Sequence, residues 1–144
     1  MAVARATLRT DIWDTLYTYL TSTNPITVAT SNVLSAFNSG LVKDKGYPLV
    51  IISPPLVSKV NQTLKGNFKE AGAIVNFDIY DDTAQGVKSI VDNLSDKLDD
   101  GASVLFNARL KLENQESGDY STWEEGKKKI HRITIPVTFR WVGK

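Results

Sequence analysis

The run from Ala73 to Leu98 constrains the fold most, because an alternating pattern changes into a helical one within it. Val75, Phe77 and Ile79 alternate with polar residues, which is the period of two expected of a strand with one buried face. Further along the run, apolar residues return at helical spacing on a single stripe: Val87, Ile90, Val91, Leu94 and Leu98. The sequence therefore predicts a β-strand that leads directly into an amphipathic helix.

Two signals are expected to bound this helix, which we predict over about residues 83–99. Asp82 can accept hydrogen bonds from the free amides of the first turn, and Gln85 can reach back to it, as in a capping box. Gly101, directly after Asp100, supplies a stop signal at the other end.

A first helix is predicted over about residues 7–21, because leucine or isoleucine recurs there every fourth residue. Pro25 closes this segment, since a proline disfavours the helical conformation at the residue before it. Residues 26–46 show no clear pattern, and we predict no element for them.

Four segments have strand patterns. Residues 47–53 are apolar on both phases, as in a central strand covered on two sides, whereas residues 72–80, 103–113 and 130–142 alternate. Pro136 cannot donate to a strand ladder, so we expect the last strand at an edge of the sheet, or bulged there.

The order of elements predicts an α+β fold: a four-stranded, mainly antiparallel sheet with two helices packed on one face. At 144 residues, a single domain over residues 1–144 is expected. Two features should extend beyond this core. Residues 56–68 contain a turn signal and predict a projecting hairpin. Residues 114–129 are polar and longer than an ordinary hairpin connection, which predicts a long functional loop.

Composition excludes several function classes. The chain has no cysteine, which rules out disulfides, cysteine–zinc sites and thiol nucleophiles. His131 is the single histidine, and without an evident carboxylate or nucleophile partner we interpret it as structural. A net charge of +1 is far from the basic excess of a dedicated nucleic-acid binder. We expect no membrane contact, because the apolar run Leu49–Ile52 is far shorter than the ~20 residues that span a bilayer and no signal peptide is evident.

Asp78, Asp81 and Asp82 form an acidic cluster that could bind magnesium, and with Lys111 and Glu113 they loosely suggest a metal-dependent nuclease. The structural interpretation is stronger. Asp81 and Asp82 lie where helix caps are favoured, and Asp78 is on the outward phase of its strand. We therefore predict no catalytic residue, no metal site and no cofactor.

Two aromatic residues in the 114–129 connection, Tyr120 and Trp123, have no position in the predicted core, so we expect them to contact a partner protein. The lysine run 127–129 is interpreted as a solvated limb of a hairpin, with phosphate contact as the alternative. Three lysines in or beside the projecting hairpin are the better candidates to face DNA: Lys59, Lys65 and Lys69.

Charge is distributed unevenly. Six acids lie between Asp81 and Asp100, whereas residues 127–144 hold six basic residues and no acid. Such segments can pair between copies of the chain, and we predict the contact through four residues: Asp92, Asp96, Arg132 and Arg140.

The order of elements resembles the tail terminator, or tail-completion, proteins of long-tailed bacteriophages. In that family an N-terminal helix, a strand that begins Tyr-Pro, a long hairpin and an alternating strand running into an amphipathic helix precede a closing pair of strands. The corresponding stretches here are Tyr47–Ile52, Val57–Phe68, Val75–Leu98 and Ile130–Trp141. Tyr80 matches the aromatic that often ends that family's strand, and the resemblance covers about residues 8–142.

This resemblance implies a structural virion protein and not an enzyme. It implies a homo-oligomeric ring, usually hexameric, that is assembled in the host cytoplasm and located at the neck, on the head-proximal end of the tail tube. There it would end tube growth and join tail to head. Its partners would be copies of itself, the tail tube protein and the head connector or stopper protein, with DNA passing through the lumen without sequence specificity.

The residues alone leave two other functions open. One is a metal-dependent nuclease that uses the Asp78, Asp81 and Asp82 cluster, and the other is a monomeric module that binds a protein or nucleic acid through Trp123. A mass measurement separates a ring from both, because either alternative is expected to be a monomer.

Overall fold

Both helices and strands form in this chain, which confirms the predicted α+β class. The computed structural model describes residues 3, 7–35, 46–62, 68–116 and 118–142. Within these residues the α-helices are α1 (Leu8–Thr18), α3 (Ala84–Asp100) and α4 (Ala102–Asn107). A π-helical turn (Tyr19–Thr23) continues α1, and a 3-10 turn (Thr30–Asn32) precedes the first strand. The strands are β1 (Val33–Leu34), β2 (Leu49–Ile52), β3 (Leu56–Gln62), β4 (Phe68–Asp81), β5 (Leu110–Gln115), β6 (Asp119–Glu125) and β7 (Lys128–Val142).

The described strands form one seven-stranded mixed sheet, so the predicted four-stranded sheet was too small. Its order is β1-β2-β4-β7-β5, with β3 also beside β4 and β6 also beside β7. Only the β1–β2 pair is parallel among these strands. The predicted strands 47–53, 72–80 and 130–142 correspond to β2, β4 and β7. Strand β1 has only two residues, too few to show a period.

β4 and β7 are the two long central strands, and each outer position is shared by two shorter strands. β2 and β3 lie beside β4, and β5 and β6 lie beside β7. Beside β4 the chain passes from β2 to β3, and beside β7 it passes from β5 to β6. Both changes occur at the same level along the two central strands. Ser53 donates its amide to the carbonyl of Asn76 (3.0 Å), Glu116 donates its amide to the carbonyl of Pro136 (3.0 Å), and Asn76 is the register partner of Pro136.

The change from β5 to β6 beside Pro136 explains how the sheet tolerates this proline. The expectation of an edge position for β7 was wrong, because β7 has β4 on one side and β5 and β6 on the other. The nitrogen and carbonyl of a strand residue point to the same side. Since the Pro136 carbonyl accepts from Glu116, its nitrogen faces the interval between β5 and β6, where no ladder donor is required.

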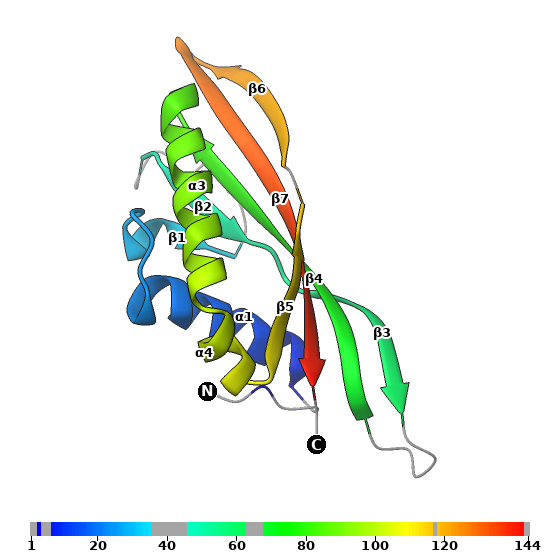
Figure 1. The fold of residues 1–144 in the computed structure, drawn as a ribbon. Coiled ribbons are helices and arrows are strands. Elements are labelled where there is room, and N and C mark those ends of the chain that lie inside the picture. The colour runs from blue at the N-terminus through cyan, green and yellow to red at the C-terminus, as the bar shows by residue number, and fades with distance from the viewer. Residues whose placement is uncertain (1–2, 4–6, 36–45, 63–67, 117, 143–144) are drawn as a thin grey trace.

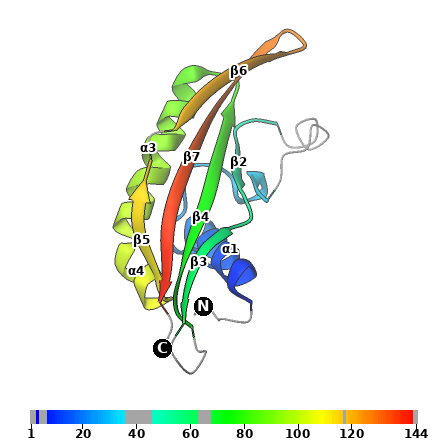
Figure 2. The same cartoon turned by 90° about the vertical axis from the view of Figure 1, so that its right-hand side faces the viewer.

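All three described α-helices cover one face of the sheet. Figure 2 shows the opposite face, which none of these three helices covers, toward the viewer, with α1 and α3 behind the strands. Phe77 and its neighbours Val75 and Ile79 are fully buried on the helix side, which confirms the predicted phase of β4. The predicted stripe of α3 packs against the same core, and its buried members are Val87, Ile90, Leu94 and Leu98.

Polar contacts attach the helices to this core. Trp13 in α1 donates from Nε1 to the carbonyl of Ile52 (2.7 Å), at the end of β2. The hydroxyl of Tyr19 donates to the carbonyl of Lys97 (2.6 Å), which joins the π-helical turn to the last turn of α3. Gly101 makes room for this ring, since an added Cβ would lie 2.1 Å from the Cζ atom of Tyr19.

The predicted strand over 103–113 was half wrong, because its first part is the helix α4. Val104 and Phe106, which an alternating strand over 103–113 would place on the same side as Leu110, are 47% and 55% exposed, whereas Leu105 is buried. The chain leaving α3 must reverse direction before it can pair antiparallel with β7. It does so through α4 and Arg109, which has a positive φ of 68°.

The predicted long loop over 114–129 was also wrong, because most of it is the strand β6, hydrogen-bonded to β7. The connection is a two-residue turn, Gly126–Lys127, between the paired residues Glu125 and Lys128. Gly126 has a φ of 64°, the conformation that a type II′ hairpin turn requires at its first central position. The sequence signals were Gly126 and the alternation of Tyr120 with polar neighbours.

The start of α3 differs from the prediction by one residue. Thr83, not Asp82, is the N-cap, and its hydroxyl accepts from the amide of Gly86 (3.0 Å). A Cβ at Gly86 would lie 1.9 Å from a carboxylate oxygen of Asp81, so a larger residue at this position would force the Asp81 side chain to move. Gly101 ends the helix as predicted.

Two strand pairs extend the sheet beyond the helices at opposite ends of the molecule (Figure 1). The β6–β7 hairpin extends past the start of α3, and β3 with the paired half of β4 extends past α1. The predicted projecting hairpin over 56–68 therefore corresponds to β3 and the beginning of β4, and residues 63–67 lie outside the described residues. None of the described helices has the length and apolar character needed to cross a bilayer.

Candidate interaction surfaces

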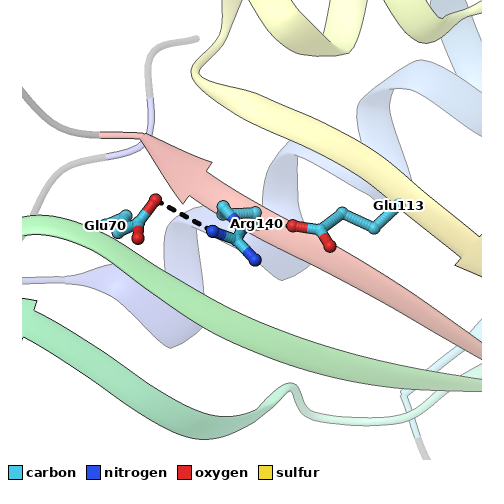
Figure 3. Close-up of polar contacts among 3 residues, drawn as sticks. All are labelled: Glu70, Glu113 and Arg140. Atoms are coloured by element: carbon cyan, nitrogen blue, oxygen red, sulfur yellow. Dashed lines mark hydrogen bonds and ion pairs between the residues drawn. The ribbon is translucent and has the colours of Figure 1, made fainter.

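The face of the sheet that none of the described helices covers carries Arg140 between two carboxylates (Figure 3). Its guanidinium forms ion pairs with Glu113 of β5 and with Glu70 of β4, the latter at 3.1 Å. The hydrogen bonds that Arg140 donates to Glu113 and Glu70 raise its pKa above the usual value. Arg140 is still 44% exposed, but its charge is compensated within its own chain. A partner would therefore meet a charge network and not a free cation.

The other end of this face is more apolar. Leu49, Ile51, Tyr80 and Ile130 form a separate buried cluster there. Burial raises the pKa of the Tyr80 hydroxyl, and a hydrogen bond with Arg132 opposes that rise. Arg132, half-buried, also donates from Nε to the hydroxyl of Ser121 (3.1 Å) in β6. This predicted interface residue is therefore partly committed to contacts within its own subunit.

Asp92 and Asp96 lie on the exposed side of α3, away from the stripe that faces the sheet. Arg132 and Arg140 lie on β7 at positions that alternate with its buried residues, so they belong to the other face of the sheet. The structure thus does not bring the four predicted interface residues together within one subunit. It separates the two acids from the two arginines across the thickness of the molecule.

Tyr120 is on β6 and is 51% exposed, with its hydroxyl hydrogen-bonded to Nδ1 of His131 on β7. The two rings are tilted, with centroids 5.8 Å apart. His131 therefore has a side-chain partner that sequence reasoning missed, because the hairpin that joins the two residues was not predicted. The side chain of Trp123 lies outside the described part of the structure, as do the side chains of Lys59 and Lys69 and the whole of Lys65.

Of the three aspartates in the nuclease hypothesis, Asp81 and Asp82 contact each other, whereas Asp78 contacts a different residue. Asp78 accepts a hydrogen bond from the hydroxyl of Thr134, and Asp81 accepts one from the amide of Asp82 (2.7 Å). Because Asp78 and Asp81 are three residues apart in β4, their side chains leave opposite faces of the strand. In the part of the chain that the structure describes, no group of three or more histidine, aspartate or glutamate side chains could hold a metal ion.

An open groove of about 620 Å³ lies between α3 and β5, and sequence reasoning did not find it. We call it the α3–β5 groove; it is lined by Val91, Ser95, Asp99, Leu112, Glu113, Asn114, Gln115, Glu116, Gly118 and Ile135. Three apolar residues and three acids are among these, and none is basic. The groove depends on the break between β5 and β6 and on the angle of α3, neither of which a periodicity reveals.

Comparison of this chain with models of known protein families and with curated protein sequences found no match.

Proposed function

We propose that this chain is a structural virion protein that forms a homo-oligomeric ring at the head-proximal end of a bacteriophage tail tube. There it ends tube growth and joins tail to head. The proposal starts from the resemblance in the order of elements between this chain and the tail terminator proteins. It requires a subunit that contacts two ring neighbours and also partners above and below.

The observation that carries the proposal is the extension of the sheet past the helical layer at both ends (Figure 1). Strands that leave their own core expose side chains and backbone that a neighbouring chain can cover. Leu56 at the start of β3 (63% exposed) and Tyr120 near the start of β6 (51% exposed) are large apolar residues on the strands that form these two extensions. Exposed aromatic and aliphatic residues of this kind are typical anchors of protein interfaces.

Charge also supports self-association. Asp92 and Asp96 lie on one side of the two-layer subunit. Of the two arginines on the other face, Arg140 is compensated by Glu70 and Glu113, whereas Arg132 forms no ion pair among the described residues and is the one that can attract these acids. A subunit with different, complementary surfaces on opposite sides pairs head to tail, and such contacts close into rings when the rotation allows. The net charge of +1 suits a pore through which DNA moves without being held.

The test of this proposal is the mass of the purified chain, measured by size-exclusion chromatography with light scattering. We expect a closed oligomer at low salt that dissociates toward the 15.9 kDa monomer as salt increases. Exposed ion pairs are screened over ~10 Å at 0.1 M salt, which is the reason for this dependence. A chain that stays monomeric at low salt and high concentration, with or without tail tubes, contradicts the ring and favours a monomeric binding module.

The neighbours of the ring are tested separately. We expect Trp123→Ala to leave the fold intact but to block joining of tails to heads in an assembly reaction. Changing Lys59, Lys65 and Lys69 together to Gln is expected to alter DNA passage more than assembly, because phosphate contacts are electrostatic and sequence-independent. If Trp123→Ala instead unfolds the protein, its side chain belongs to the core and the β6 interface is wrong.

A further inference from the structure

The α3–β5 groove combines an apolar floor with an acidic rim. Val91, Leu112 and Ile135 provide the floor, and Asp99 and Glu116 are exposed on the rim. The third acid among the lining residues, Glu113, pairs its side chain with Arg140 on the other face of the sheet. Asp99 accepts a hydrogen bond from the neutral amide of a groove glutamine, and neither it nor Glu116 forms an ion pair among the described residues. The groove therefore keeps negative charge beside apolar surface.

The β6–β7 turn has the complementary chemistry. Lys127, Lys128 and Lys129 follow one another at the end of the hairpin, and all three are exposed. Lys128 and Lys129 are register partners of two glutamates in β6, whereas Lys127 lies in the turn itself, outside these cross-strand pairs. Lysine side chains cover apolar surface with their methylene stems while the ammonium groups reach carboxylates.

We infer that the β6–β7 turn of one copy docks in the α3–β5 groove of the next copy. Figure 2 shows the turn leaning away from the edge that carries α3 and β5. A second copy placed beside the first in the same orientation can therefore present its turn to that edge. The donor and acceptor surfaces differ, so the contact is heterologous and repeats from copy to copy. The inference rests on the proposed ring and names the surfaces that hold it together.

Charge-reversed variants test the contact. The turn variant carries Lys127→Glu, Lys128→Glu and Lys129→Glu, and the groove variant carries Asp99→Lys and Glu116→Lys. The control carries Asp11→Lys and Asp14→Lys on α1, the same change in charge as the groove variant. We expect the control to keep the oligomeric mass of the wild type and each of the other two to fall to the monomer mass. Thermal melts followed by circular dichroism confirm that each variant is folded.

Mixing gives the decisive result. In a 1:1 mixture the acidic turn of one variant meets the basic groove of the other, and the basic turn meets the acidic groove. We expect the mixture to regain the wild-type mass as a particle of alternating subunits. If the wild type is oligomeric but both variants remain so, or if the mixture stays monomeric, the inference is wrong while the ring stands. A monomeric wild type removes the ring and this contact with it.

The absence of native cysteines provides a second measurement. Chains carrying Lys127→Cys and Glu116→Cys are mixed and oxidised, and the products are separated by mass. We expect the mixed disulfide dimer to exceed that formed by Lys127→Cys with Asp14→Cys at least tenfold. Equal yields of the two cross-links would overturn the inference whatever the mass of the wild type.

Discussion

Gly101 ends α3 and leaves the space that the ring of Tyr19 occupies. In Gly101→Ala the new Cβ would overlap the buried ring, whose hydroxyl is held by the carbonyl of Lys97. We expect a loss of about 1–3 kcal/mol in the free energy of unfolding, the usual cost of overpacking, measured by urea denaturation. Tyr19→Leu removes the overlapping atoms, so the same glycine change in that background should cost less. Equal costs in both backgrounds would assign the effect to the helix end alone.

Asp81 gives the stability a dependence on pH. Burial raises the pKa of its carboxyl above 3.8, and the hydrogen bond from the amide of Asp82 opposes that rise. A raised carboxyl pKa means that the folded state binds the proton more tightly than the unfolded state. This stabilisation is therefore complete below pH 3.8 and is lost as pH increases through the folded pKa.

Asp81→Asn tests this sign, because asparagine can still accept from the amide of Asp82. We expect the variant to be more stable than the wild type at pH 7 and the difference to shrink as pH falls toward 3, in thermal melts at several pH values. Asp96→Asn, an exposed position on α3, is the matched control. A wild type that gains on the variant as pH increases would show that the charged form is favoured in the folded state.

At the scale of elements, Arg109 marks the reversal from α4 into β5. Its φ of 68° is a backbone conformation that costs a side-chain-bearing residue free energy and that glycine adopts readily. We expect Arg109→Gly to stabilise the protein by up to ~1 kcal/mol in urea denaturation. Arg109→Ala loses the same side chain but keeps the strain, and it should not stabilise. Equal effects of the two substitutions would assign the change to the arginine side chain.

The elements that were predictable are those with one uninterrupted period. The stripe from Val87 to Leu98 and the alternation through Phe77 each extend over enough residues to define a face. The prediction of a strand over 103–113 was wrong in its first part, because Val104 and Phe106 alternate by coincidence in a helix that is too short to show its own period. The prediction of a loop over 114–129 was wrong because Tyr120 and its polar neighbours form the strand β6. Gly126 is the signal for the turn that joins this strand to β7 in a hairpin.

The sequence predicted which charged residues the candidate surfaces contain, but not how those residues are arranged. The acids of α3 and the basic residues of β7 could be counted along the chain, and their placement on opposite sides follows from the two-layer fold. That Arg140 is compensated by Glu70 and Glu113 depends on the β4–β7–β5 register, and the α3–β5 groove depends on the break between β5 and β6. Contacts of this kind are tertiary, and no local pattern carries them.

At the scale of the whole molecule, one core joins every described helix to one face of the sheet. Phe77 lies at its centre and is fully buried. We expect Phe77→Ala to lower the free energy of unfolding by about 3–5 kcal/mol and to leave a single transition in urea, since β2 and β4 contribute residues both to this core and to the smaller cluster on the other face. Val104→Ala, at an exposed position of α4, should change it by less than about 0.5 kcal/mol. Two resolved transitions would divide the molecule into independent parts.

The level marked by Asn76 and Pro136 also has a mechanical consequence. Only β4 and β7 cross it as continuous strands, whereas on either side of it another strand flanks each of them. Bending the sheet at this level distorts fewer interstrand hydrogen bonds than bending it through either half. The sheet is therefore least stiff at the level of Asn76 and Pro136, where α3 supports it. The angle between its two projecting ends can adjust there while both halves stay intact, and in the proposed ring this would let identical copies fit neighbours of different curvature.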